Sequence, residues 1–201
     1  EAAELTMMGR LGYDAVTFGN HEFDYRSNGL SEMLISAVKN KEEDASLTLP
    51  MLLSANIDWE KNKDQEDQKL REAMELYGAK PYTILERNGV KIGIYGVLGQ
   101  EAEDFAPESG IDFDPIVDTS KKIVKELKDQ GAEMIICLSH SGTNEDSSKS
   151  EDEELARKVP DIDVIISGHT HTKLEDYIKE GDTYIAVSYT HLRAHETRGN
   201  L

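Results

Sequence analysis

The chain has 201 residues, of which 38% are hydrophobic and 31% charged, and its formal net charge is −18. This length suffices for one domain with a sizeable core, and we expect no transmembrane segment because no apolar run is long enough to cross a membrane. The acidic charge argues against nucleic acid as a partner, since duplex binding requires a basic surface. If the substrate were a phosphate ester, the positive charge that binds it would have to come from something other than the net charge of the chain. The single cysteine, Cys137, excludes an internal disulfide.

The first part of the sequence predicts alternating helices and strands. Glycine residues and charged runs separate the apolar segments and mark their ends. The predicted elements are a helix over residues 2–11 that ends at Gly12, a strand over 15–20, a helix over 30–39, a strand over 51–57, and a charged surface excursion over 58–78 whose second half is helical.

The second part predicts a hairpin followed by buried strands. Asn88 and Gly89 lie between two apolar runs, which is typical of a two-residue hairpin. Asp114 and Pro115 are expected to begin a helix that ends at Gly131. Two nearly continuous apolar runs, MIICLSH (134–140) and DVIISGHTH (163–171), follow, with a short helix near 151–158 between them. Such runs indicate parallel strands buried on both faces, and hence an α/β fold.

Polar side chains follow three of the predicted strands. They are Asn20 and His21 in the first case, His140 in the second, and His169 and His171 in the third. In open α/β sheets, ligands bind outside the carboxyl ends of the strands. In an extended backbone His169 and His171 would face the same side. Imidazole nitrogens and an amide oxygen suit zinc or manganese, so the pattern predicts a metal site.

Each motif taken alone has a simpler interpretation. A single histidine such as His140 at a strand end is usually a hydrogen-bonded structural residue, and Gly-His-Thr-His is compatible with a polar turn. The three motifs together, each after a buried strand, favour the metal site.

With these motifs the sequence resembles the calcineurin-like metallophosphoesterases, and among them the 5′-nucleotidase family. The matching stretches are GYDAVTFGNHEFD, LLSANI, GVKIGIYGVLGQE, LSHSG and DVIISGHTH, spread over residues 12–171 in the family's order. The resemblance implies a layered α-β-β-α sandwich and two divalent metal ions, zinc, manganese or similar. It implies hydrolysis of nucleotides or other small phosphate esters.

The resemblance also assigns roles to individual residues. It makes Asn20, His140 and His169 ligands of one metal and His171 a ligand of the other. His21 becomes the catalytic histidine and Asp24 its carboxylate partner, which would fix the imidazole tautomer. The substrate-binding residues stay unknown.

Part of the family's pattern has no counterpart in the sequence. An Asp-x-His strand and a Gly-Asp segment with the metal-bridging aspartate should precede residue 1, so the sandwich is expected to lack its first strands. The C-terminal substrate domain is also expected to be missing. We therefore expect residues 1–188 to be a partial metallophosphoesterase domain that binds at most one metal well and has little or no activity. Residues 189–201 are expected to be a non-native tail, although His191 and His195 have a spacing that could bind zinc.

Alternatives remain open at this point. A 2′,3′-cyclic-nucleotide phosphodiesterase or a broad phosphomonoesterase would share the metal motifs, and a non-catalytic metal-binding module would need no activity. The acidic run 145–154 is expected to be solvated, and Cys137 to be a buried hydrophobic residue. The resemblance implies an extracellular, periplasmic or cell-surface location.

Overall fold

The structure, a computed structural model, describes residues 2–187 of the chain. Its α-helices are α1 (Ala3–Leu11), α2 (Arg26–Glu43), α3 (Gln65–Tyr77), α4 (Gln100–Asp104), α5 (Ile116–Asp129) and α6 (Glu151–Lys158). Its short 3₁₀ helices are η1 (Asn20–Phe23), η2 (Pro107–Ser109) and η3 (Ser147–Lys149). Its strands are β1 (Ala15–Val16), β2 (Met51–Leu52), β3 (Tyr82–Arg87), β4 (Val90–Leu98), β5 (Met134–His140), β6 (Val164–Ser167), β7 (Ile178–Glu180) and β8 (Thr183–Val187).

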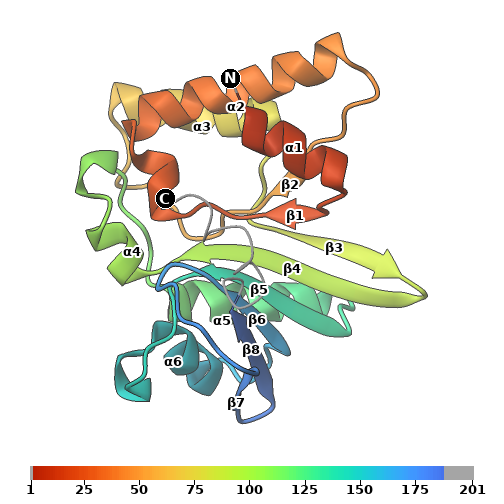
Figure 1. Cartoon of the computed structure of the whole chain (residues 1–201), viewed down its shortest axis with the longest axis vertical. Coiled ribbons are helices and arrows are strands. Elements are labelled where there is room, and N and C mark those ends of the chain that lie inside the picture. Colours follow the sequence, from red (N-terminus) through yellow and green to blue (C-terminus); the bar gives the residue numbers. More distant parts are fainter. Residues whose placement is uncertain (1, 188–201) are drawn as a thin grey trace.

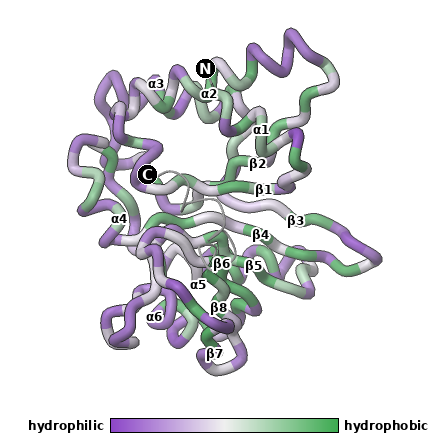
Figure 2. The backbone as a smooth tube through the Cα atoms, viewed as in Figure 1, coloured by the Kyte–Doolittle hydropathy of each residue, from purple (hydrophilic) through white to green (hydrophobic). Residues whose placement is uncertain are grey.

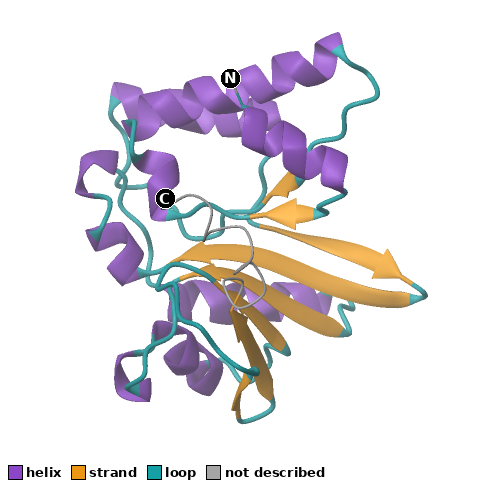
Figure 3. Ribbon diagram, viewed as in Figure 1, coloured by secondary structure: helices purple, strands orange, loops and turns teal. Residues whose placement is uncertain are grey.

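The elements form layers, as predicted for an α/β sandwich. Helices α1, α2 and α3 lie on one side, the strands lie in the middle, and α5 and α6 lie on the other side (Figures 1 and 3). The main sheet has six strands in the order β3-β4-β5-β6-β8-β7, and β1 and β2 form a separate parallel pair. Strands β4, β5, β6 and β8 run parallel, whereas the edge strands β3 and β7 are antiparallel to their neighbours. The carboxyl ends of β5 and β6 therefore lie at the same edge of the sheet.

Two hydrophobic clusters fill the layers. The first packs α1, α2 and α3 together and includes Leu34, Leu52 and Leu70. The second packs the main sheet against α5 and α6 and includes Leu127 and Ile165. Figure 2 shows hydrophobic residues along the inner strands and hydrophilic residues in the loops around α6.

The hairpin prediction is confirmed. Strands β3 and β4 pair antiparallel, and Asn88 and Gly89 between them both have positive φ angles, of 52° and 81°. Positive φ at both central residues is what a type I′ turn requires, so the Asn-Gly pair follows the local geometry. Gly12 and Gly78 end α1 and α3 in the left-handed conformation, as expected.

Several predicted boundaries were wrong. Within the predicted strands over 15–20 and 51–57, β1 and β2 pair with each other over two residues each, and Leu53 and Ile57 form isolated bridges to Lys80 and Phe113. The helix expected over 30–39 extends as α2 from Arg26 to Glu43. Pro115 occupies the N-cap position of α5 without a side-chain cap, and the Asp114 amide donates to the Asn56 carbonyl (2.7 Å).

Strands β5 and β6 of the main sheet are not fully buried on both faces, contrary to the prediction. Cys137 and Ile165 are fully buried on the face covered by α5 and α6, whereas Ile166 and Tyr184 are each 40% exposed. The acidic run was also interpreted incorrectly in part, since Asp152 is 0% and Glu153 6% exposed in the first turn of α6. No helix among residues 2–187 is long and apolar enough to cross a membrane. The predicted tail, with His191 and His195, lies outside the described residues.

Candidate metal centre

Three predicted site residues meet at one amide oxygen. Oδ1 of Asn20 lies 2.9 Å from Nε2 of His140 and 3.2 Å from Nδ1 of His169. The two imidazole rings are 5.2 Å apart between their centroids. His140 and His169, which lie 120 and 149 positions after Asn20 in the sequence, thus present their polar atoms to the same point as Asn20.

Strand pairing brings the two histidines together. His140 is the last residue of β5, and the loop that carries His169 leaves the adjacent parallel strand β6. The Gly168 amide donates to the Ser139 carbonyl (2.9 Å), which continues the pairing one residue beyond β6. The sheet register therefore determines which residues arrive at this edge.

A short turn holds Asn20 against them. Asn20 begins η1, and the Glu22 side chain in this turn accepts a hydrogen bond from the Gly19 amide (2.6 Å). A Cβ atom at residue 19 would lie only 2.6 Å from Cε1 of His140, so the approach of the two segments requires glycine. The sequence alone did not predict that Gly19 permits the close approach or that Glu22 holds the turn, although both residues stand inside the stretch GYDAVTFGNHEFD.

The third motif reaches the site by a different geometry from the predicted one. His169 and His171 were expected to share an extended backbone, but their φ angles are 82° and 51°. Left-handed backbone is unfavourable for a side chain with a Cβ atom, and residues held in it cluster at functional sites. Both histidines nevertheless line the same cavity as Asn20 and His140.

His21 and Asp24 form the predicted pair. Nδ1 of His21 lies 3.2 Å and 3.1 Å from the two carboxylate oxygens of Asp24, three residues further along the chain. Both side chains are exposed, at 74% and 57%. His21 also lines the cavity that contains Asn20, His140 and His169.

The cavity that these residues line has a volume of about 600 Å³, a size typical of small-molecule sites. Glu101 and Phe105, from α4 and the residue after it, form part of its wall, and the Phe105 ring lies 5.6 Å from the ring of His169. The cavity therefore combines nitrogen donors with a carboxylate and an exposed aromatic ring.

The environment favours neutral imidazoles. Burial, together with the neighbouring His169, His21 and His171, lowers the pKa of His140 to about 4. Burial also lowers the pKa of His169, which Glu101 partly offsets. A neutral imidazole has the lone pair that a metal ion requires, so the donors present here fit a zinc or manganese ion. Asn20, His140 and His169 would hold it.

The arrangement offers fewer ligands than a complete two-metal site. Within residues 2–187, no group of three histidine, cysteine or carboxylate side chains is arranged to hold a metal ion. The cluster at Asn20 consists of two imidazoles and one amide.

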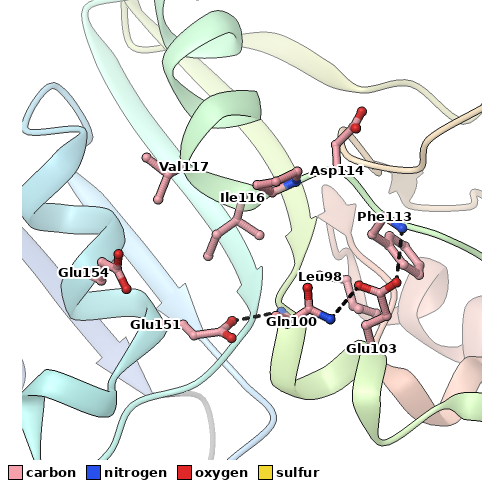
Figure 4. A pocket seen from close by; sticks show the side chains of 10 residues that line it. Leu98, Gln100, Glu103, Phe113, Asp114, Ile116, Val117, Glu151 and Glu154 are labelled. Carbon is pink, nitrogen blue, oxygen red and sulfur yellow. Dashed lines mark hydrogen bonds between the residues drawn. The ribbon is translucent and has the colours of Figure 1, made fainter.

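A second, smaller cavity has a different character. It measures about 160 Å³, and several carboxylates line it (Figure 4). Glu151 accepts hydrogen bonds from the amides of Gln100 (3.1 Å) and Glu101 (3.0 Å), and Glu103 accepts one from Phe113 (3.4 Å). These carboxylates connect α4 to its neighbours and therefore have a structural role.

Comparisons with known proteins identify a family for this chain. Residues 3–173 match the family described as calcineurin-like phosphoesterase. The chain is 34% identical over 200 residues to the trifunctional nucleotide phosphoesterase protein YfkN of Bacillus subtilis, covering 92% of this chain and 13% of that protein. It is 33% identical over 177 residues to a probable 5′-nucleotidase of Treponema pallidum, covering 87% of this chain and 25% of that protein.

A solved structure shows the same fold. The 5′-nucleotidase precursor of Thermus thermophilus superposes with a TM-score of 0.71 at 24% identity, over 93% of this chain and 35% of that one. The chain thus spans between 13% and 25% of the length of these two curated relatives. Since the family match covers most of its residues, the chain belongs to the calcineurin-like phosphoesterase family.

Proposed function

We propose that this chain is the metal-binding part of a 5′-nucleotidase, an enzyme that hydrolyses phosphate monoesters of nucleotides. The convergence of Asn20, His140 and His169 at one oxygen atom carries the proposal. A bound divalent ion would supply positive charge for the phosphate and activate a water molecule for attack on phosphorus. This charge answers the difficulty that an acidic chain presents to a phosphate ester.

The protein residues have separate tasks in this mechanism. Asn20, His140 and His169 hold one ion, and His171 is a ligand of a second. Asp24 holds the ring of His21 by its Nδ1 atom and fixes its orientation. The His21 ring stabilises the phosphoryl oxygens or donates a proton to the leaving nucleoside oxygen.

We further propose that the 201-residue chain by itself binds at most one ion well and turns over nucleotides poorly or not at all. The limited ligand set supports this proposal, because no group of three histidine, cysteine or carboxylate side chains within residues 2–187 is arranged to hold a metal ion. Zinc titration by calorimetry measures the stoichiometry. Two tightly bound ions together with nucleotide hydrolysis by this chain would contradict it.

Two substitutions test the division of roles. His169→Ala should lower zinc affinity strongly, whereas His21→Ala should leave zinc binding intact and abolish turnover in a protein that contains the complete site. Asp24→Asn is a milder control, which should reduce the rate while leaving metal content unchanged. Equal loss of zinc in His21→Ala and His169→Ala would show that the assignment is wrong.

A second activity has support from the relative named a trifunctional nucleotide phosphoesterase. The same ligands would serve a 2′,3′-cyclic-nucleotide phosphodiesterase or a broad phosphomonoesterase. Rates with AMP, 2′,3′-cyclic AMP and a chromogenic phosphate separate these activities. Zinc binding without hydrolysis of any of the three would favour a non-catalytic metal-binding module.

The proposed location is outside the cytoplasm, in the periplasm, at the cell surface or in the medium. It rests on the resemblance to 5′-nucleotidases, and cell fractionation with an antibody against the chain tests it.

A further inference from the structure

The two loops that carry the site histidines are joined by a closed ring of hydrogen bonds. The Thr143 amide donates to Oγ1 of Thr170 (3.1 Å), and the Thr172 hydroxyl donates to the Thr143 carbonyl (3.0 Å). The hydroxyls of Thr170 and Thr172 lie 2.9 Å apart. Because the Thr172 proton is already used, the Thr170 hydroxyl must donate to Thr172, which closes the ring. We call this ring the hydroxyl latch.

The latch occurs where the loops approach unusually closely. Gly142 has a φ of 96°, and a Cβ atom there would lie 2.3 Å from the Thr170 methyl carbon. A glycine at this point of the loop after β5 therefore allows Thr170 to reach the main chain of Thr143. The sequence shows both partners, as SHSGT at 139–143 and GHTHT at 168–172, but spacing alone does not reveal that they touch.

The loop after β5 is anchored on its other side by a buried carboxylate. Asp152 is 0% exposed and lies in the first turn of α6. Its Oδ1 atom accepts a hydrogen bond from the Ser139 hydroxyl (2.6 Å), and its Oδ2 atom accepts one from the Gly142 amide (3.2 Å). The segment that includes His140 is thus fixed to α6 on one side, and the latch connects it to the second loop on the other.

The latch residues alternate with histidines whose backbone is strained. Thr170 and Thr172 directly follow His169 and His171, and both histidines have positive φ angles. Surrounding contacts must maintain such a conformation, because a residue with a Cβ atom disfavours it. The two threonine side chains supply contacts at each step of this loop.

We propose that Thr170 and Thr172 are positioning residues of the metal site, which hold the imidazoles of His169 and His171 in place relative to His140. The consequence for metal affinity rests on the proposed function, whereas the positioning of the rings does not. Outer contacts that orient metal ligands typically change affinity by about 10-fold to 100-fold when they are removed.

The test uses the whole 201-residue chain and four proteins: wild type, Thr170→Val, Thr170→Ser and Thr83→Val. Valine keeps the shape of threonine but removes the hydroxyl, and serine restores the hydroxyl. Thr83 lies in the edge strand β3 and controls for the substitution itself. Zinc affinity is measured by calorimetry, and histidine ring resonances and exchange of the Thr143 amide are measured by NMR without metal.

Thr170→Val should weaken zinc binding by about 10-fold, shift the ring resonances of His169 and His171, and speed exchange of the Thr143 amide. Thr170→Ser and Thr83→Val should match the wild type in all three measurements. Unchanged ring resonances and unchanged zinc affinity in Thr170→Val would overturn the proposal. So would a loss that Thr170→Ser does not restore.

The same measurements distinguish an error in the proposed metal site from an error in the proposed role of the latch. If the wild type binds no zinc while Thr170→Val still shifts the histidine resonances, the latch positions the rings and the metal assignment is wrong. If the wild type binds zinc and Thr170→Val binds it equally well with unshifted rings, the metal assignment holds and the latch has no positioning role.

Discussion

The two halves of the molecule bring side chains to the site by different means. The first half, with α1 to α3 and the strands β1 and β2, supplies Asn20 from a short turn that the Glu22 side chain stabilises. The second half supplies His140 from the end of a long strand and His169 from a loop fixed by hydrogen bonds to it. The site lies where these halves meet, so its geometry depends most on the closest contact between them.

The largest expected effect comes from that contact. Gly19→Ala places a methyl group against the His140 ring, 2.6 Å from Cε1, and must separate Asn20 from His140. We expect zinc affinity, measured by calorimetry, to fall by about 100-fold. Gly168→Ala is the matched control, because its nearest atom, Nδ1 of His140, is 3.1 Å away and needs only a small displacement. Equal affinities for Gly19→Ala and the wild type would refute this dependence on the contact between the halves.

A second effect concerns Asp152, the buried carboxylate that anchors the loop after β5 in the second half of the molecule. Burial raises the pKa of Asp152 to about 6, from an ordinary value of 3.8. The folded chain therefore holds this proton more tightly than the unfolded chain. The contribution of this group to the free energy of unfolding is complete below pH about 4 and is lost as the pH rises through about 6.

Asp152→Asn should remove this dependence. The difference in unfolding free energy between wild type and variant, from urea titrations at pH 4 to 7, should change by on the order of 2 to 3 kcal/mol across that range. A constant difference would show that Asp152 does not titrate as its burial implies.

A smaller effect is expected in the hairpin between β3 and β4, away from the contact between the two halves. Gly89 turns the hairpin with a φ of 81°, and no atom lies within 4 Å of the position of an added Cβ. Gly89→Ala should cost roughly 1 kcal/mol of stability from backbone strain alone. Zinc affinity should stay at the wild-type value. A weakened zinc site in this variant would show that hairpin and site are coupled.

The smallest expected effect concerns Cys137 in the middle of β5. The residue is 0% exposed, and burial raises the pKa of its thiol well above its usual range. We expect no reaction with Ellman's reagent at pH 8 in the folded chain, and one thiol per chain after unfolding in guanidinium. Rapid labelling without denaturant would show that the sheet opens locally.

Features determined by nearby residues could be predicted from the sequence. Asn88 and Gly89 predicted the hairpin because their positive φ angles are a local requirement. The apolar runs that end in His140 and Ser167 predicted neighbouring parallel strands, and hence the meeting of the site residues at one edge.

Features determined by distant contacts could not be predicted. Strand β1 pairs with β2 over two residues, and this pairing depends on residues 36 positions away. The left-handed conformation of His169 and His171 accompanies the hydroxyl latch, in which Thr170 meets a loop 27 residues earlier. Asp152 stands in an acidic run that suggested a solvated surface, and only the packing of α6 buries it.

The shared amide oxygen of Asn20 has a consequence for the kinetics of the proposed site. Since both imidazoles point at this atom, part of their freedom of motion is given up during folding. Capture of an ion would then need no rearrangement of the loops, and loss of water from the ion would limit its speed.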